Sequence, residues 1–278
     1  RTKLIGEEIC VMDGYRVKGQ ERKYTFLSLV MAGLVLCALL GEPTVNAYQE
    51  GVVAGGGTIS GVMKFSGIVP SPKTHKVTMG SNPEFCQTIA DKKGVIGISE
   101  VRVSSKQQLA DVVVFLQEVE RGKPVPKEGP VVTVDRCQFA PRVIGAMDEQ
   151  TLRIVMRDPI VHQLRGWEML DKGRLPLFHF PDLGEGGEET VPLKTRGSSI
   201  IKLECDQHRF MQGWLLLAAN PYVTVSDDDG LFRLTDVPEG THTVGAWHPV
   251  LGYQEAKVTL ISGRQETLEL TFVSPLKP

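Results

Sequence analysis

The feature that most limits the fold of this chain is a series of short hydrophobic runs, each of strand length and each bounded by turn-forming residues. Between residues 131 and 220 these runs read VVTVDRC, PRVIGAM, TLRIVMRD, VPLKT, SSIIKLEC and GWLLLAAN, separated by Gly, Pro, Asp or Asn. ADVVVFLQEVE (110–120) is a Val-rich run that predicts a buried strand, whereas 163–190 is expected to carry little regular structure. Beyond residue 47 the sequence has no long stripe of helical periodicity. We therefore predict an all-β protein.

The C-terminal part of the chain has turn signals at the spacing of β-hairpins. DG at 229–230, PEG at 238–240 and SG at 262–263 punctuate the segment 222–272 and predict four to five strands. SDDDG (226–230) is interpreted as a hairpin turn, because the Glu that completes a calcium-binding loop is missing.

A C-terminal segment of about 50 residues is marginal as an independent core, and a β-sandwich needs about seven strands. GTISGVMKFSG (57–67) alternates with period two and can supply a missing strand. We predict that 53–127 and 221–273 together form one sandwich and that 128–220, inserted between them, forms a second. The alternative is one extended domain over 53–220 followed by a separate domain.

Residues 1–47 are predicted to be a secretory signal with an N-terminal extension. Basic residues precede a hydrophobic run at 24–40, and the small residues near 45–47 suit a signal peptidase. The alternative is a retained membrane anchor, for which the run is at the short limit. We expect the rest of the chain in the periplasm or another extracytoplasmic, oxidising compartment, attached to a membrane only if this segment is retained.

The chain has an odd number of cysteines after residue 47, so at least one of them cannot form a disulfide within the chain. Of the five, Cys10 and Cys37 lie in the N-terminal segment, which leaves Cys86, Cys137 and Cys205. Cys86 and Cys137 have no metal-binding neighbours in the sequence, so we predict a disulfide between them. Closing that loop contributes about 4 kcal/mol in the chain-entropy model. Cys205 is then the free thiol.

Three soft or borderline donors lie together in LECDQHRFMQG (203–213), where Cys205, His208 and Met211 follow one another at intervals of three. A type 1 copper site uses one Cys, two His and a weak axial Met. The best source of the second imidazole is His162, which follows a predicted strand and an Asp-Pro turn at 158–159. This set predicts one copper ion bound by residues from two distant segments.

Other interpretations of the same residues stay open. A Cys-x2-His pair is half of a zinc site, but the chain has no second pair at finger spacing, and Met is a poor zinc ligand. Cys205 could be a core thiol with His208 on a solvated loop and Met211 as packing. A nucleophilic Cys205 with His208 as its base needs further groups for which the sequence has no signature.

The other histidines are expected to be structural or surface residues. His179 lies in the long stretch after the Asp-Pro turn and could cover the copper pole without binding the ion. His242 and His248, six apart on one strand, share a face and are expected to be exposed rather than to form an accessory metal site.

The ligand pattern and the strand GWLLLAANPY resemble the cupredoxins, particularly those of the amicyanin and plastocyanin type. The tail SDDDGLFRLTDVPEGTHTVGAWHP resembles the carboxypeptidase-regulatory-like, transthyretin-like sandwich, and exported proteins of the methylamine-utilisation type combine the two. The resemblance implies a cupredoxin Greek-key sandwich beside a regulatory-like one, and a disulfide at Cys86 and Cys137. Gln163 departs from the family, which usually has an Asn that braces the Cys loop.

These features predict an electron carrier or a subunit of a redox complex, not an enzyme. The outer edge of His208, flanked by Phe210 and Trp214, is expected to be the electron port where a redox partner protein docks, and no small-molecule substrate is expected. The net charge of −2 gives no basic surface for nucleic acid. A copper carrier or sensor and a metal-free interaction module are the alternatives.

Overall fold

The structure, a computed structural model, describes residues 48–77 and 82–276. These residues form an all-β protein of sandwich-like sheets, so the predicted fold class is confirmed. The helices that the structure describes in full are two short pieces, α2 (Pro83–Cys86) and the 3-10 turn η2 (Gln87–Ile89). None of its helices has the length and hydrophobicity to cross a membrane. The predicted signal segment lies outside the described residues.

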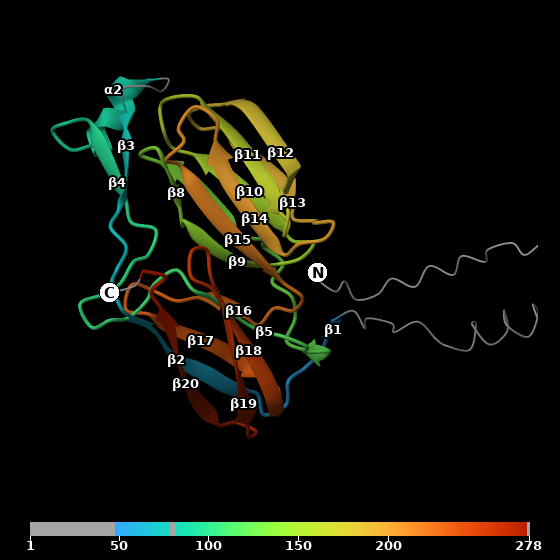
Figure 1. Cartoon of the computed structure of the whole chain (residues 1–278). Helices are drawn as coiled ribbons and strands as arrows, with labels where there is room; N and C mark the ends of the chain where they lie inside the picture. The colour runs from blue at the N-terminus through green and yellow to red at the C-terminus, as the bar shows by residue number, and fades with distance from the viewer. Residues whose placement is uncertain (1–47, 78–81, 277–278) are drawn as a thin grey trace, which may run out of the picture. The chain divides into compact units, whose positions relative to one another are not determined.

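Nine consecutive strands build the first sandwich (Figure 1). They are β7 (Val131–Asp135), β8 (Gln138–Ala140), β9 (Val143–Met147), β10 (Thr151–Met156), β11 (His162–Met169), β12 (Arg174–Leu183), β13 (Glu188–Pro192), β14 (Ile200–Cys205) and β15 (Gln212–Ala218). One sheet has the order β13-β10-β7-β8 and the other has the order β12-β11-β14-β15-β9. Buried side chains of both sheets, such as Ile154 and Leu203, meet in one hydrophobic core.

The second sandwich takes its strands from both ends of the described chain. They are β2 (Gly57–Ser66), β5 (Val113–Leu116), β16 (Val223–Val225), β17 (Leu231–Val237), β18 (Gly240–His248), β19 (Gly252–Leu260) and β20 (Gln265–Val273). The sheet orders are β16-β5-β18-β19 and β17-β2-β20. Strands that precede the first sandwich in the sequence therefore pair with strands that follow it. The five strands after residue 220 match the number predicted from the turn signals.

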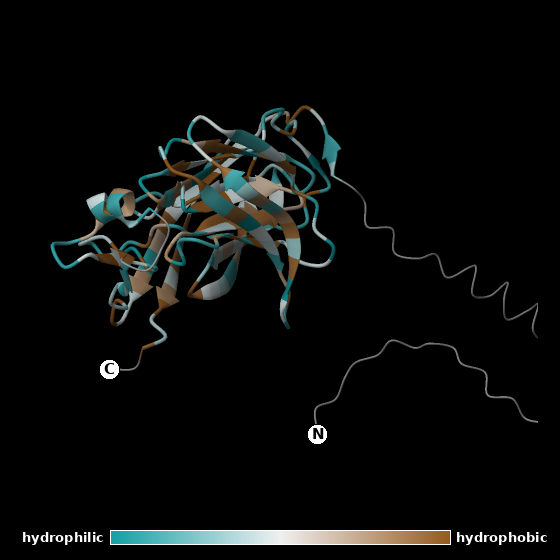
Figure 2. Cartoon of the chain, turned by 90° about the horizontal axis from the view of Figure 1, so that it is seen from above, coloured by the Kyte–Doolittle hydropathy of each residue, from teal (hydrophilic) through white to brown (hydrophobic). Residues whose placement is uncertain are grey.

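Alternation along the strands explains which side chains enter the cores. In β14, IIKLEC buries every second residue, as a strand with one face on the core and one face in water must do. Figure 2 shows the same alternation of hydrophobic and hydrophilic residues along many of the strands.

The prediction that residues 163–190 carry little regular structure is wrong. This stretch contains β11, β12 and the start of β13. β11, HQLRGWEM, alternates buried and half-buried positions, but a His, a Gly and a Glu occupy positions on its buried side, so hydrophobicity alone does not reveal the period. β12 contains two prolines and is an edge strand, where a missing backbone N–H is tolerated.

The SDDDG segment forms a turn, as predicted, but not a hairpin. Asp227 Oδ1 accepts hydrogen bonds from the backbone N–H groups of Asp229 (3.0 Å) and Leu231 (2.8 Å), and Gly230 has a positive φ of 66°. The flanking strands β16 and β17 belong to different sheets. The turn therefore carries the chain from one sheet of the second sandwich to the other.

A two-stranded sheet, β3 (Lys73–Lys76) with β4 (Val95–Ile98), packs on the first sandwich together with α2. Val77, Cys86 and Ile96 are buried in the same core as Cys205 and Met211. Two further strands, β1 (Gln49–Glu50) and β6 (Arg121–Gly122), pair in parallel. The packing of the segment around β3 and β4 on the first core was not predicted from the sequence.

A small hydrophobic cluster joins the strands of the two sandwiches. It contains Val113 of β5, Val143 of β9, Leu216 of β15 and Trp247 of β18. Trp247 meets Trp214 edge-on, with ring centroids 6.3 Å apart.

His248, at the end of β18, is fully buried, so the expectation that it is exposed is wrong. Its Nδ1 atom accepts hydrogen bonds from the backbone N–H groups of Val250 (3.1 Å) and Leu251 (3.3 Å). Burial lowers the pKa of His248 to about 4; the charge of Asp111 opposes the shift, and nearby arginines reinforce it.

We predict that His248 makes stability depend on pH in the mildly acidic range. The folded state keeps the ring neutral, while the unfolded chain binds a proton below about pH 6.5. This contribution is therefore fully present above that pH and declines as pH falls towards 4, by about 2 kcal/mol at pH 5. Urea unfolding between pH 7 and 4.5 should give a shallower decline for His248→Gln, with His242→Gln on the same strand as the control. Parallel curves for the wild type and His248→Gln would contradict this assignment.

Candidate metal centre

Strand pairing brings His162 and Cys205 to the same end of the first sandwich. His162 is the first residue of β11 and Cys205 is the last residue of β14. The two strands are antiparallel neighbours, with Leu164 opposite Cys205. Because antiparallel neighbours place the start of one strand beside the end of the other, the two side chains meet although 43 residues separate them.

The three nitrogen and sulfur donors converge closely. Cys205 Sγ lies 3.7 Å from His162 Nδ1 and 3.6 Å from His208 Nδ1. The two imidazole rings have centroids 5.0 Å apart and are inclined at 58°. Relative exposure is 0% for His162, 2% for Cys205 and 2% for His208. Each of the three can offer one ligand atom to a common ion.

These separations fit a bound metal ion. Bonds of about 2.3 Å to sulfur and about 2.0 Å to nitrogen, at angles between tetrahedral and trigonal, hold the S and N atoms about 3.5 to 3.7 Å apart. The observed separations of 3.6 and 3.7 Å lie in that range. The donor set of one thiolate and two imidazoles suits copper or zinc, because both metals accept soft sulfur and borderline nitrogen.

The loop after β14 is compact and internally bonded. The backbone N–H of His208 donates to the Cys205 carbonyl (3.3 Å), and that of Met211 donates to the His208 carbonyl (2.8 Å). The Asp206 N–H donates to the Gln163 carbonyl (2.9 Å), so the backbone of Gln163 braces this loop. Met211 is 1% exposed and lies in the same core as Cys205.

The surroundings of the Cys205 thiol lower its pKa and so favour the thiolate. Burial raises its pKa, but hydrogen bonds from His162, His208 and the Gln163 backbone outweigh burial and lower the pKa to about 6. Burial lowers the pKa of His162, yet its bonds to Asp158 and Cys205 leave that pKa above the ordinary value. A thiolate is the form of cysteine that binds metals.

Asp158 determines the orientation of the His162 ring and which of its nitrogens keeps a proton. Its carboxylate accepts from His162 Nε2 (2.9 Å) and from the backbone N–H groups of Arg136 (2.5 Å) and Cys137 (2.8 Å). Burial raises the pKa of Asp158, but these donors outweigh it and keep the pKa low, so the group stays an acceptor. The protonated ring can donate from Nε2 to Asp158 and from Nδ1 to Cys205. When the ring loses one proton, Asp158 keeps the other on Nε2, and the Nδ1 lone pair is then free to bind a metal ion. Sequence reasoning assigned this Asp only to a turn; its position four residues before the predicted ligand was the available signal.

The outer edge of His208, the expected electron port, is covered by other residues, because His208 is only 2% exposed. His208 Nε2 lies 3.5 Å from Cys86 Sγ, and Cys86 forms a disulfide with Cys137. Phe210 does flank the His208 ring, at a centroid distance of 5.7 Å. Trp214 instead contacts Trp247 in the cluster between the sandwiches.

The other histidines do not join the cluster. His179 Nε2 lies 3.8 Å from Asp206 Oδ2 near the candidate centre, without a place among its donors. His242 Nε2 contacts the Pro238 carbonyl at 2.8 Å. A second group of possible ligands within the described residues contains Cys137, Asp158 and His162. Its cysteine is already in the disulfide and cannot supply a thiolate.

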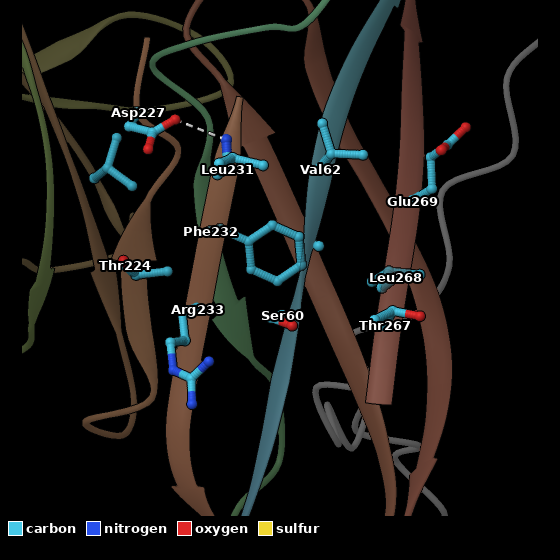
Figure 3. A pocket seen from close by; sticks show the side chains of 12 residues that line it. Ser60, Val62, Thr224, Asp227, Leu231, Phe232, Arg233, Thr267, Leu268 and Glu269 are labelled. Atoms are coloured by element: carbon cyan, nitrogen blue, oxygen red, sulfur yellow. Dashed lines mark hydrogen bonds between the residues drawn. The ribbon is translucent and has the colours of Figure 1, made fainter. Parts of the chain in front are cut away.

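Two hollows of the surface differ in their chemistry. One, of about 580 Å³, lies between β3 and the loop after β14 and is lined by His75, Lys76, Arg209 and Phe210 among others. The other, of about 740 Å³, lies over β2, β17 and β20 (Figure 3). Its lining includes Arg233 and Glu269 but no Cys or His, so it offers no soft metal ligand.

Comparisons with solved structures find cupredoxins. An amicyanin mutant in its reduced Cu(I) form is 15% identical over 34% of this chain and 85% of that chain, with a TM-score of 0.28. A purple cupredoxin from Nitrosopumilus maritimus is 14% identical over 32% of this chain and 99% of its own, also with a TM-score of 0.28.

A Cu-containing nitrite reductase from Thermus scotoductus SA-01 is 20% identical over 34% of this chain, which spans 23% of the reductase, with a TM-score of 0.28. No family model and no curated protein matches the chain.

We predict that Asp158→Ala lowers the free energy of unfolding of the metal-free protein by about 3 kcal/mol or more, because it leaves two buried donors and one partly buried donor without their acceptor. Asp206→Ala is the matched control: this carboxylate is exposed and pairs with Arg165, so its removal should cost about 1 kcal/mol or less. Urea unfolding of both variants at pH 7 measures the difference. Equal losses would show that the Asp158 carboxylate does not stabilise the site.

Proposed function

We propose that this chain is an exported type 1 copper protein that transfers one electron at a time. The observation that carries the proposal is that His162 Nδ1 and His208 Nδ1 lie 3.7 and 3.6 Å from Cys205 Sγ in a buried site. Met211, buried in the same core as Cys205, is the proposed weak axial ligand. When bound there, copper supplies a one-electron change between Cu(I) and Cu(II).

The protein contributes a fixed set of donors. His162 is oriented by Asp158, His208 is held by the loop after β14, and Cys205 is held by the pairing of β14 with β11. Since the side chains are buried and bonded on their outer sides, they have little freedom to follow the different geometries that the two oxidation states prefer. A site that does not rearrange has a small barrier to electron exchange.

The same features favour copper over zinc and electron transfer over carriage. A structural zinc site needs four good ligands, whereas this cluster offers one cysteine and two histidines, with Met211 in the same core as Cys205. A copper carrier must release its ion to a partner, whereas these ligands are covered from outside. The redox partner protein is proposed to dock near His208, at the hollow that His75, Arg209 and Phe210 line together with it.

We predict that one equivalent of Cu(II) gives the wild-type protein an intense visible band from thiolate-to-copper charge transfer. Cys205→Ser should abolish the band, because serine is not a thiolate donor, and His162→Ala should weaken or remove it. His179→Ala is the matched control, because this histidine lies near the centre but outside the donor set, and its band should be unchanged.

Absorption spectra and copper content of the four proteins together test the proposal. Unchanged copper content in Cys205→Ser would contradict it and favour a metal-free interaction module. Tight binding of Cu(I) without a visible band on addition of Cu(II) would favour copper carriage.

A further inference from the structure

The outer sides of both candidate histidine ligands are covered by one disulfide. Cys86 Sγ lies 3.5 Å from His208 Nε2. Its disulfide partner Cys137 has its sulfur within 4.8 Å of a ligand nitrogen of His162 and of a carboxylate oxygen of Asp158. Cys86 and Cys137 are both completely buried. The disulfide and the Asp158 carboxylate thus form one layer behind the two imidazoles.

Each half of this layer is fixed to a different part of the chain. Cys137 lies in the turn between β7 and β8, where Arg136 and Cys137 have φ values of 51° and 53°, a left-handed conformation that non-glycine residues adopt only when it is held in place. Asp158 holds that turn by accepting both backbone N–H groups. Cys86 ends α2, whose neighbours Val77 and Ile96 are buried in the core of the first sandwich.

We propose that the Cys86–Cys137 disulfide is a positioning element of the metal centre, which closes the outer edge of His208 and holds the turn that orients Asp158 against His162. The inference rests on the proposed function, in which these histidines bind copper. It assigns the disulfide a role beyond closing a loop: the His208 ring cannot swing outwards without displacing a covalent cross-link.

Because the disulfide is buried, its role at the site is not thiol–disulfide exchange. A disulfide that takes part in exchange must be reached by an attacking thiolate, and neither sulfur here is accessible to solvent. The free thiol of the described residues, Cys205, lies on the inner side of the same histidines. The disulfide therefore acts by its position and not by its redox chemistry.

The decisive experiment needs no metal. Diethylpyrocarbonate labels accessible imidazoles, and peptide mass spectrometry gives the rate for each histidine in the metal-free protein. In the wild type, His208 should react at least about tenfold more slowly than the half-exposed His179. In Cys86→Ala/Cys137→Ala, His208 labelling should rise by about tenfold or more while His179 labelling stays constant.

Leu152→Ala controls for lost stability. Leu152 is fully buried in the same core, so its truncation destabilises the sandwich but leaves the disulfide intact. If the disulfide only stabilises the fold, His208 labelling should rise as much in Leu152→Ala as in the double variant. That result would overturn the proposal, and so would unchanged labelling in the double variant.

If the double variant does not fold, the wild type treated with a phosphine replaces it. His208 labelling should then rise together with the alkylation of Cys86, and labelling independent of reduction would overturn the proposal.

A second measurement uses the copper-loaded protein. The rate at which a Cu(I) chelator removes the ion should be at least about tenfold higher in the double variant than in the wild type, and clearly higher than in Leu152→Ala. Equal rates in the double variant and Leu152→Ala would count against a positioning role. If the wild type binds no copper, the proposed function fails, while the labelling result still decides whether the disulfide closes His208.

Discussion

The candidate centre depends on the antiparallel pairing of β11 with β14. This pairing sets the start of one strand beside the end of the other, and so places His162 next to Cys205. A shift of the register by one residue would turn Cys205 from the buried face to the solvent face, because side chains alternate along a strand. The register is protected by the core, since Leu164, Ile201 and Leu203 of the same two strands are all buried. Hydrophobic packing of the sandwich thereby fixes the positions of polar ligands at its end.

The sequence was most informative where chemistry was local. The spacing of Cys205, His208 and Met211 in one short loop predicted a set of donors, and a predicted strand followed by an Asp-Pro turn predicted His162 as a further one. The structure brings His162, Cys205 and His208 together. The short hydrophobic runs predicted the all-β class, which the structure has. The structure also joins Cys86 to Cys137, the two cysteines without metal-binding neighbours in the sequence. The division into two domains, the signal segment and the redox partner stay predictions.

The sequence was least informative where the outcome depended on tertiary contacts. β11 was missed because Glu168 and His162 occupy buried positions, and a buried carboxylate is tolerated only through its partners. Glu168 accepts hydrogen bonds from the backbone N–H groups of Arg196, Gly197 and Ser198, which no periodicity can reveal. In the same way, the closure of His208 depends on Cys86, which is 122 residues away in the chain.

The buried disulfide connects the metal centre with the compartment in which the protein folds. Both sulfurs are enclosed, so the bond must form before or while the first core closes. Such a bond forms and persists in oxidising compartments and not among the thiols of the cytosol. A chain that kept Cys86 and Cys137 reduced would have three thiols near two imidazoles, and a soft metal could then bind in more than one way. The predicted export of the chain therefore has a chemical consequence at the site: oxidation removes two competing thiols and leaves Cys205 as the single thiolate donor.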